Sequence, residues 1–451
     1  MSLRIWMPLR GDVENQGLSS VETAKSGASL FTTTTGKLTS AYYNTTAGHG
    51  AYIFNYMDEL KTYENYSLCA WVRLVSSAVG HTSIIVSGSG NWNNENQNFL
   101  FGLYNFSSDK YLRLIVPSTG TWNSQLALSE GIALNKWYHI AITYDGTVTK
   151  AYVNGEYSGQ RSGGGICSGA TNTFLKIGAS TYSSNYTLKG AMNDFRIYDH
   201  CLSTKEIKEI SKALLLHYKL DGTTIEGTNE FDCSGYRNDG KTMGSPALVE
   251  GSPKYEYCTE FGGSSKYTRA FRGAMTKDAI SVCLWVYMSN WSTYGKSARM
   301  ISCTQAGGWN FESASTGEIR FLAYASGTSE AGYVFAKDNV TAANLSSGWH
   351  HFVGTYDKDA DKVCYYRDGN FISSASTGNR PLGYHSQNGI FIGAEANTDL
   401  NFPTTPYFDG RINDVRIYAT ALSPEDVAEL YHTPASIDNK GNFYCGEIKE
   451  E

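Results

Sequence analysis

Several short runs of the chain alternate between apolar and polar or aromatic residues with a period of two, rather than the period of 3.6 that marks a helix. The run at 137–145 is the clearest example. One of its faces carries Trp137, His139, Ala141 and Thr143, and the other carries Tyr138, Ile140, Ile142 and Tyr144. The run at 349–357 repeats the pattern. Such runs predict strands of a sheet that has at least one buried face.

Two tight turns are expected next to these runs. The pairs Asn154-Gly155 and Asp368-Gly369 each stand between apolar or aromatic flanks. Both central residues of a type I′ turn take positive φ, which Gly, Asn and Asp tolerate best. The sequence therefore predicts β-hairpins at 154–155 and 368–369.

The second half of the chain repeats the first half in the same order. The segment 136–146 (KWYHIAITYDG) returns at 348–358 (GWHHFVGTYDK). The block 190–210 returns at 410–430, and both copies contain the motif N-D-x-R-I-Y. Small changes in the spacing between repeats are what loop insertions would produce. The domains predicted from this repeat are 1–212 and 213–434, followed by a C-terminal tail at 435–451.

One helix is expected at the end of each copy. Ser203 and Ser423 are suited to capping a helix, because Glu206 and Asp426 follow three residues later as a capping box requires. Pro424 stands at the favoured first helical position. Copies of about 200 residues, built of short strands and hairpins without alternating helices, predict a two-sheet jelly-roll sandwich. The predicted fold class is therefore all-β, with two tandem sandwiches that are each closed by a short helix.

Composition narrows the class of protein further. Hydrophobic residues make up 41% of the 451 residues, charged residues 18% and aromatic residues 13%, which excludes bulk disorder. The formal net charge is -6 and no run is rich in Lys or Arg, so nucleic-acid binding is not expected. The sequence predicts neither a membrane span nor a secretory signal. The nine cysteines include no CxxC pair, and we expect free, mostly buried thiols in a reducing compartment.

The repeated blocks resemble the laminin-G-like, concanavalin A-like jelly-roll domains. The resemblance is carried, in fixed order, by CAWV or CLWV, by W-[YH]-H-x-x-x-T-Y-D, by the Asn-Gly or Asp-Gly hairpin, by I-G-A, and by G-x-[MI]-N-D-x-R-I-Y-x-x-x-L-S. It covers nearly all of residues 3–432. The opening WMPLRGDVENQGLS and the closing TPASIDNKGNFYCGEI are also similar to proteins that tailed bacteriophages and prophages carry on the virion.

Lectins, binding modules and glycosidases share this fold, so activity has to be argued from a site. A retaining glycosidase needs two carboxylates about 5–5.5 Å apart, usually at alternate positions of one strand, and no E-x-D-x-E run occurs. Glu312 and Glu318, or Asp145 and Glu156, are interpreted as solvated surface carboxylates. The sequence therefore predicts a protein that is not an enzyme.

A carbohydrate site would need exposed aromatic rings, whose faces pack on sugar C–H groups, beside amides that hydrogen-bond sugar hydroxyls. The loop at 88–98 and loops of the second copy have this mixture. The predicted carbohydrate-binding residues are Trp92, Asn93, Asn94, Trp291, Tyr294 and Trp309. The alternative for each Trp is partial burial at the edge of a sandwich.

The resemblance also implies a Ca²⁺ ion beside the first and last strands of such a domain, where hard oxygen ligands gather. The metal ligands expected in the second copy are Asp232, Asn238, Asp239 and Asp414. The first copy offers only Asp12, Asn15 and Asp194, so calcium is expected in the second domain rather than the first. The alternative is that these are turn residues that hydrogen-bond their own backbone, and that Arg196 and Arg416 pair with local carboxylates.

These features together predict a non-enzymatic surface protein of a tailed-phage virion, made in the host cytoplasm, that serves as a decoration, fibre or adsorption component and attaches to host-surface glycans. Other virion proteins are expected partners, and either the tail 435–451 or the boundary around residue 213 is expected to dock on them. Membrane insertion is not expected. The oligomeric state stays open. The alternative is a bacterial surface or secreted carbohydrate-binding protein, and a polysaccharide-cleaving enzyme is a third reading.

Overall fold

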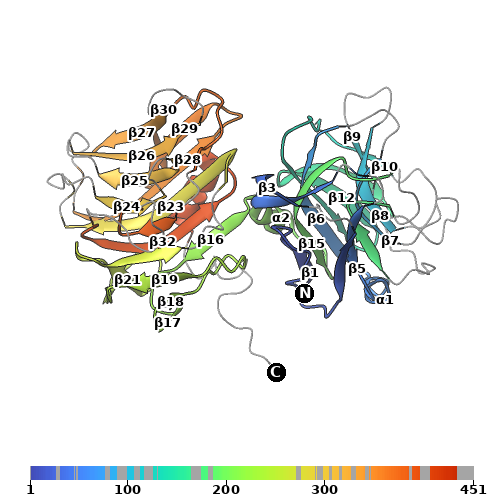
Figure 1. Ribbon diagram of the computed structural model, residues 1–451, viewed down its shortest axis with the longest axis horizontal. Coiled ribbons are helices and arrows are strands. Elements are labelled where there is room, and N and C mark those ends of the chain that lie inside the picture. The colour runs from blue at the N-terminus through green and yellow to red at the C-terminus, as the bar shows by residue number, and fades with distance from the viewer. Residues whose placement is uncertain are drawn as a thin grey trace. The chain divides into compact units, whose positions relative to one another are not determined.

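The computed structural model divides the chain into two compact units, Met1–Ser211 and Lys212–Glu451 (Figure 1). The boundary lies one residue before the predicted one. The residues that the structure describes are 2–26, 31–44, 46, 49–76, 82–88, 99–105, 112–115, 125–129, 131–163, 174–180, 186–270, 276–289, 291, 298–303, 307–313, 317–326, 332–340, 345, 347–384, 389–396 and 407–433. The predicted tail at 435–451 lies outside them.

The first unit contains two antiparallel sheets. The eight-stranded sheet has the order β13 (Glu156–Ser162), β12 (Val148–Val153), β11 (Tyr138–Tyr144), β6 (Tyr66–Leu74), β15 (Gly190–Tyr198), β4 (Thr39–Asn44) and β3 (Phe31–Gly36), and β1 (Leu3–Met7) pairs with β15. The seven-stranded sheet has the order β10 (Gln125–Ala127), β9 (Leu112–Ile115), β8 (Phe99–Asn105), β7 (Thr82–Gly88), β14 (Leu175–Ile177), β5 (Gly50–Ile53) and β2 (Thr23–Ser26).

The second unit has the same plan. Its eight-stranded sheet has the order β20 (Ala247–Glu250), β21 (Tyr257–Glu260), β32 (Arg411–Tyr418), β23 (Ala279–Met288), β28 (Gly348–Asp357), β29 (Lys362–Arg367) and β30 (Asn370–Ala375), and β16 (Leu214–Tyr218) pairs with β32. Its nine-stranded sheet has the order β17 (Ile225–Glu226), β18 (Asn229–Glu230), β19 (Gly240–Met243), β22 (Tyr267–Ala270), β31 (Ile390–Ile392), β24 (Arg299–Ser302), β25 (Trp309–Ser313), β26 (Glu318–Tyr324) and β27 (Tyr333–Asn339).

The strand orders of the two units correspond. The order β13-β12-β11-β6-β15 of the first unit matches β30-β29-β28-β23-β32 of the second, and β10-β9-β8-β7-β14-β5 matches β27-β26-β25-β24-β31-β22. Both units are all-β and are built from the blocks that repeat in the sequence. The predicted fold class is therefore confirmed.

The predicted strand faces and hairpins are also confirmed. Ile140 and Ile142 belong to the core of the first unit, whereas His139 lies on the opposite face of β11. The turn between β12 and β13 has φ of 50° at Asn154 and 87° at Gly155. The turn between β29 and β30 has φ of 50° at Asp368 and 78° at Gly369. Positive φ at both central positions is the type I′ geometry that the sequence predicted.

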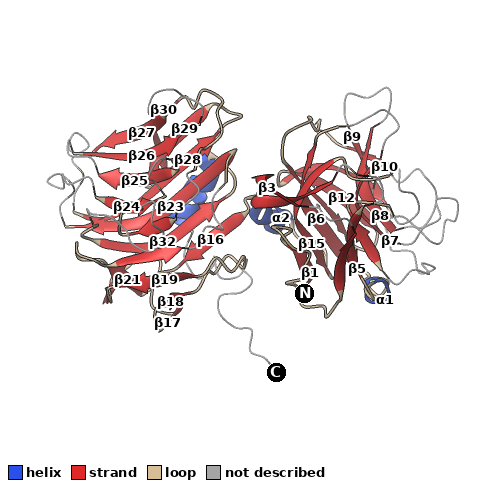
Figure 2. Cartoon of the chain, in the orientation of Figure 1, coloured by secondary structure: helices blue, strands red, loops and turns tan. Residues whose placement is uncertain are grey.

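Each unit ends in the predicted helix, drawn in blue in Figure 2: α2 (Thr204–Ser211) and α3 (Pro424–His432). The capping boxes form, since the Ser203 and Ser423 backbone N–H groups donate to Glu206 and Asp426, whose own N–H groups donate back to the serine hydroxyls. Helix α3 packs through Val427 and Leu430 on the outer face of the eight-stranded sheet. A short helix α1 (Met57–Leu60) was not predicted.

The cysteines match the expectation only in part. Six described cysteines are free thiols, but Cys233 is disulfide-bonded, so the expectation of free thiols is wrong at that position.

Among the described residues, no helix is both long and apolar enough to cross a membrane.

Candidate functional site

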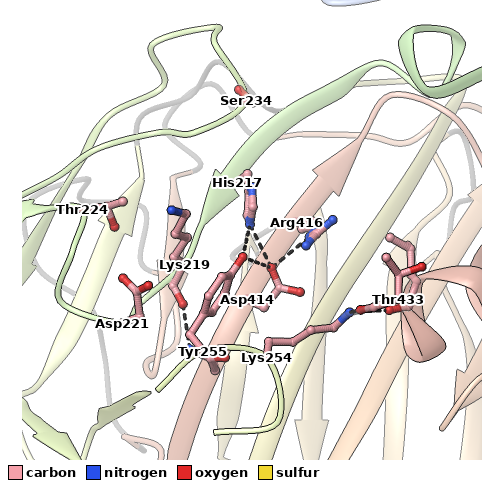
Figure 3. Close-up of polar contacts among 12 residues, drawn as sticks. His217, Lys219, Asp221, Thr224, Ser234, Lys254, Tyr255, Asp414, Arg416 and Thr433 are labelled. Atoms are coloured by element: carbon pink, nitrogen blue, oxygen red, sulfur yellow. Dashed lines mark hydrogen bonds and ion pairs between the residues drawn. The ribbon is translucent and has the colours of Figure 1, made fainter. Parts of the chain in front are cut away.

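Asp414, one of the expected calcium ligands, is held by protein donors on the closing strand β32 (Figure 3). Its Oδ1 accepts a hydrogen bond from Arg416 Nε at 2.9 Å and lies 2.8 Å from His217 Nε2. The Tyr255 hydroxyl donates to the same oxygen at 3.4 Å. Burial alone would raise the pKa of Asp414, but Arg416 and His217 outweigh it and hold that pKa below its ordinary range.

The other three expected ligands shape a turn. Asp232 accepts hydrogen bonds from the backbone N–H groups of His217, Ser234 and Asn238 at 2.8–2.9 Å. Asp239 in turn accepts one from the Asp232 N–H at 2.8 Å. Burial raises the pKa of Asp232. Among the described residues no group of three or more His, Cys, Asp or Glu side chains could hold a metal ion. The hydrogen bonds of Asp232 and Asp239 match the alternative of turn residues that bond nearby backbone, whereas Asp414 is held by side chains. Calcium binding stays a prediction.

The first unit contains the counterpart of the Asp414 arrangement. Trp6 Nε1 donates to Asp194 Oδ1 at 2.6 Å, and Arg196 Nε donates to the same oxygen at 2.9 Å. Asp194 and Asp414 both have positive φ, 55° and 51°. We call this arrangement the closing lock: an Asp at positive φ, the Arg two residues later, and a ring nitrogen from the first strand of the unit. The lock explains the N-D-x-R motif structurally, and it confirms that Arg196 and Arg416 pair with local carboxylates.

Four of the predicted carbohydrate-binding residues, Trp92, Asn93, Asn94 and Tyr294, lie outside the described residues. The other two are buried, with 1% of Trp291 and none of Trp309 exposed. Trp291 packs edge-on against Phe352, and its Nε1 donates to the Gly348 carbonyl at 3.2 Å. Trp309 shares the inward face of β25 with Phe311, as strand alternation requires. The expectation that these two rings are exposed is therefore wrong.

Another group of aromatic side chains lies on the outer face of the seven-stranded sheet. Its strands β5 and β14 contribute Ala51, Ile53, Leu175 and Ile177 to the core, so the residues that alternate with these point outward. Those outward residues are Tyr52, Phe54, Phe174 and Lys176. We call the first three the aromatic patch.

The rings of the aromatic patch contact one another and are half-buried. Tyr52 and Phe54 have centroids 5.8 Å apart and nearly parallel planes, at 7°. Phe174 lies 5.6 Å from Tyr52 in an edge-on arrangement. Lys176 pairs with Tyr52 in the ladder and places its Nζ 5.2 Å from the Tyr52 centroid. The patch thus offers rigid, partly exposed ring surface beside the polar edge of a tyrosine, a mixture suited to a sugar ring.

Sequence reasoning missed this patch. The alternating segments Gly50–Phe54 and Phe174–Ile177 contain the signal, because each interleaves aromatic or charged residues with aliphatic ones. Alternation alone does not say which face is the core. Both faces contain apolar residues, and the choice depends on which sheet packs behind.

The carboxylates considered for catalysis are also accounted for. Glu312 on β25 is buried and forms ion pairs with Arg299 and Arg320, so its interpretation as a solvated carboxylate is wrong. Glu318 pairs with Lys337 at 2.8 Å near the surface. Asp145 accepts hydrogen bonds from the N–H groups of Thr147 and Val148 in a turn, which lowers its pKa.

The fold defines a pair of concanavalin A-like β-sandwiches. The chain belongs to the concanavalin A-like lectin/glucanases superfamily, whose Laminin_G_3 profile matches residues 40–208 and 261–428. A comparison with curated proteins found no match.

Solved structures that match part of this chain include botulinum neurotoxin domains. The receptor binding domain of the C/D mosaic serotype is 15% identical, with a TM-score of 0.37 over 49% of this chain and 51% of that chain. The serotype D ligand binding domain, solved in complex with N-acetylneuraminic acid, is 13% identical, with a TM-score of 0.38 over 49% of this chain and 50% of that chain. The chain thus covers about half the length of each.

Proposed function

We propose that the protein is a non-enzymatic glycan-binding protein and that its first unit binds a saccharide on the aromatic patch. The observation that carries the proposal is the position of Tyr52, Phe54 and Phe174. They are half-buried on the outer face of a sheet whose other face is the core, so their rings are fixed by neighbours and still reach solvent. Membership of a superfamily of lectins and glucanases supports a saccharide as the ligand class.

The physical basis is the match between a rigid ring surface and the C–H face of a pyranose. Aromatic side chains have few rotatable bonds, so little conformational entropy is lost when a ligand packs on them. The nearly parallel Tyr52 and Phe54 rings hold each other in place, and Phe174 supports Tyr52 from its edge. The Tyr52 hydroxyl offers a hydrogen bond to a sugar oxygen.

The proposal is tested on a glycan array and then by titration calorimetry with the glycans that bind. Tyr52→Ala and Phe174→Ala should each weaken binding by about tenfold or more. Tyr157→Ala is the matched control, because Tyr157 is 51% exposed in the same unit but lies on β13 of the other sheet. Loss of binding in the control as well as in the patch variants, or full binding in the patch variants, would reject the patch as the site.

We further propose that the protein binds glycans without cleaving them. A general acid must hold a proton, whereas Glu312 is buried between Arg299 and Arg320, and Arg299 also pairs with Glu395 at 3.2 Å. These ion pairs favour a structural role for both carboxylates. Incubation with each glycan that binds, followed by chromatography of the products, should return the glycan intact, and release of shorter products would overturn this part.

The narrower form of the proposal places the protein on the surface of a tailed-phage particle, as a decoration, fibre or adsorption component. The similarity of the opening and closing segments to virion proteins supports it. Many copies on one particle would convert weak individual contacts into an avidity higher by about 10²–10⁴. Detection of the chain in purified particles by mass spectrometry tests it. Its recovery from a bacterial surface instead would favour the alternative of a surface or secreted adhesion protein.

A further inference from the structure

We propose a second ligand surface on the second unit, formed by the outer face of β26 and β27, and we assign it an acidic saccharide as its ligand class. The surface, which we call the β26–β27 strip, consists of Arg320, Leu322, Tyr324, Tyr333, Phe335 and Lys337. The inference rests on the proposed function and extends it to a second site, separate from the aromatic patch, that prefers acidic saccharides.

Strand alternation fixes which side chains form the strip. Ile319, Phe321 and Ala323 of β26 are buried in the core, so the residues between them point to the outer face. The cross-strand pairs on that face are Arg320 with Lys337, Leu322 with Phe335, and Tyr324 with Tyr333. The strip is therefore ordered along the strands: a pair of cations, then an apolar pair, then a pair of tyrosines.

The apolar and aromatic part of the strip reaches solvent. Phe335 is 39% exposed, and the Arg320 guanidinium lies over its ring, 5.3 Å from the centroid. Tyr324 and Tyr333 are half-buried and meet edge to face, with centroids 5.2 Å apart. The Tyr333 hydroxyl accepts a hydrogen bond from the Gly307 N–H at 3.3 Å. These contacts hold the rings in position before any ligand binds.

The two cations of the strip are the basis of its proposed preference for acidic saccharides. Arg320 and Lys337 face each other across the two strands, an arrangement of like charges that costs stability. Each is partly compensated, Arg320 by Glu312 and Lys337 by Glu318. Among the described residues, Arg320 uses only Nε in an ion pair or hydrogen bond, which leaves its two terminal nitrogens for an incoming carboxylate. The Lys337 side chain is 50% exposed beside it.

The edge of the sheet is not available for strand pairing at this point. The Lys337 N–H donates to Ser373 Oγ at 2.8 Å, and that hydroxyl donates to the Lys337 carbonyl at 2.6 Å. A peptide strand adding to β27 would have to displace both bonds. The outer face is the free surface, and its sequence of cation, apolar ring and tyrosine hydroxyls complements a sugar ring that carries a carboxylate at one end.

The test uses the full chain on an array of uronate- and sialic-acid-containing saccharides, each beside its methyl ester, which keeps the ring and removes the charge. The wild-type protein should prefer the acids, and the preference should fall as salt concentration rises. Phe335→Ala and Lys337→Ala should each weaken binding of the acids by about tenfold. Phe371→Ala is the matched control, since Phe371 is 53% exposed in the same unit on β30. Equal binding of acid and ester, or undiminished binding in Phe335→Ala, would overturn the inference.

The two proposals fail separately. If Tyr52→Ala abolishes binding of the acidic saccharides while Phe335→Ala does not, the acids bind at the aromatic patch, so the second surface is rejected and the proposed function stands. If Phe335→Ala weakens binding of the acids while Tyr52→Ala changes nothing on the whole array, the strip is supported and the aromatic patch is rejected.

Discussion

Trp6 and His217 occupy the same position in the two units and hold the same partner, since Trp6 Nε1 donates to Asp194 and His217 Nε2 lies against Asp414. Both residues pair in the ladder with the arginine of the N-D-x-R motif, Arg196 or Arg416. An indole and an imidazole have little else in common, so the shared requirement is a ring N–H that reaches a buried carboxylate. The closing lock thus joins the first strand of each unit to its last.

The first prediction concerns this donor. Trp6→Phe keeps a large ring but removes the N–H, so the buried Asp194 carboxylate loses one of its hydrogen bonds. We expect the free energy of unfolding of the first unit to fall by about 1–3 kcal/mol, measured by urea denaturation followed by circular dichroism. Trp137→Phe is the control, since Trp137 Nε1 has no hydrogen-bond partner among the described residues. Equal losses in the two variants would show that packing, and not the hydrogen bond, accounts for the effect.

The second prediction concerns acid. The pKa of Asp414 in the folded protein lies below its ordinary value, because Arg416 and His217 outweigh the effect of burial. Its contribution to stability is therefore present above the ordinary aspartate pKa of about 3.9 and is lost as the pH falls below that value toward the folded pKa. The stability difference between wild type and Asp414→Asn should shrink on acidification through this range. A difference that stays constant with pH would contradict the ion pair.

The third prediction has the opposite sign. Burial raises the pKa of Glu230 to about 7, although a hydrogen bond from Thr224 Oγ1 at 2.7 Å partly offsets that effect. The folded state holds the proton more tightly than the unfolded one, so stability is greatest below the ordinary glutamate pKa of about 4.3 and declines as the pH rises to about 7. The decline should be about 4 kcal/mol at most. Glu230→Gln should flatten the pH profile and be the more stable protein at alkaline pH, and an unchanged profile would refute the assignment.

The fourth prediction tests the core of the second unit. A Cβ added at Gly354 on β28 would overlap Cγ of Phe321, so Gly354→Ala should destabilise the unit by about 1–3 kcal/mol. Combining it with Phe321→Leu, which removes the obstructing ring, should cost less than the sum of the two single changes. Strict additivity in urea denaturation would show that the two positions are not in contact.

The fifth prediction concerns metal. Both oxygens of Asp232 and the Oδ1 of Asp414 are already hydrogen-bonded to protein groups, so chelation should leave the thermal unfolding midpoint of the protein unchanged. Differential scanning calorimetry with a chelator and with millimolar calcium measures it. A midpoint that rises with calcium, and no longer rises in Asp232→Asn, would reinstate the expected site.

Much of the fold could be predicted from the sequence, because the determinants are local. Alternation around Ile140 and Ile142, the Asn154-Gly155 and Asp368-Gly369 turns, and the Ser423 capping box each lie within a few residues of chain. Repetition of these signals in both halves then identified two copies of one domain. Helix α1, four residues long, was missed because it has no such signal.

The site was harder to predict, because it depends on contacts between distant strands. The exposure of Trp291 and Trp309 could not be judged without knowing that one packs on Phe352 and the other points inward beside Phe311. Glu312 was interpreted as a surface residue, because the sequence does not show that Arg299 and Arg320 approach it from neighbouring strands. Asp414 was predicted to be a metal ligand, because the sequence does not show its contact with His217, almost two hundred residues earlier.

The central claim is that the outer face of the seven-stranded sheet binds saccharides through its aromatic patch. The most direct measurement is the calorimetric affinity of the wild-type protein, Tyr52→Ala and Tyr157→Ala for one glycan that the array identifies. The account predicts that Tyr52→Ala binds at least about tenfold more weakly while Tyr157→Ala matches wild type. Equal affinity of all three proteins would contradict it.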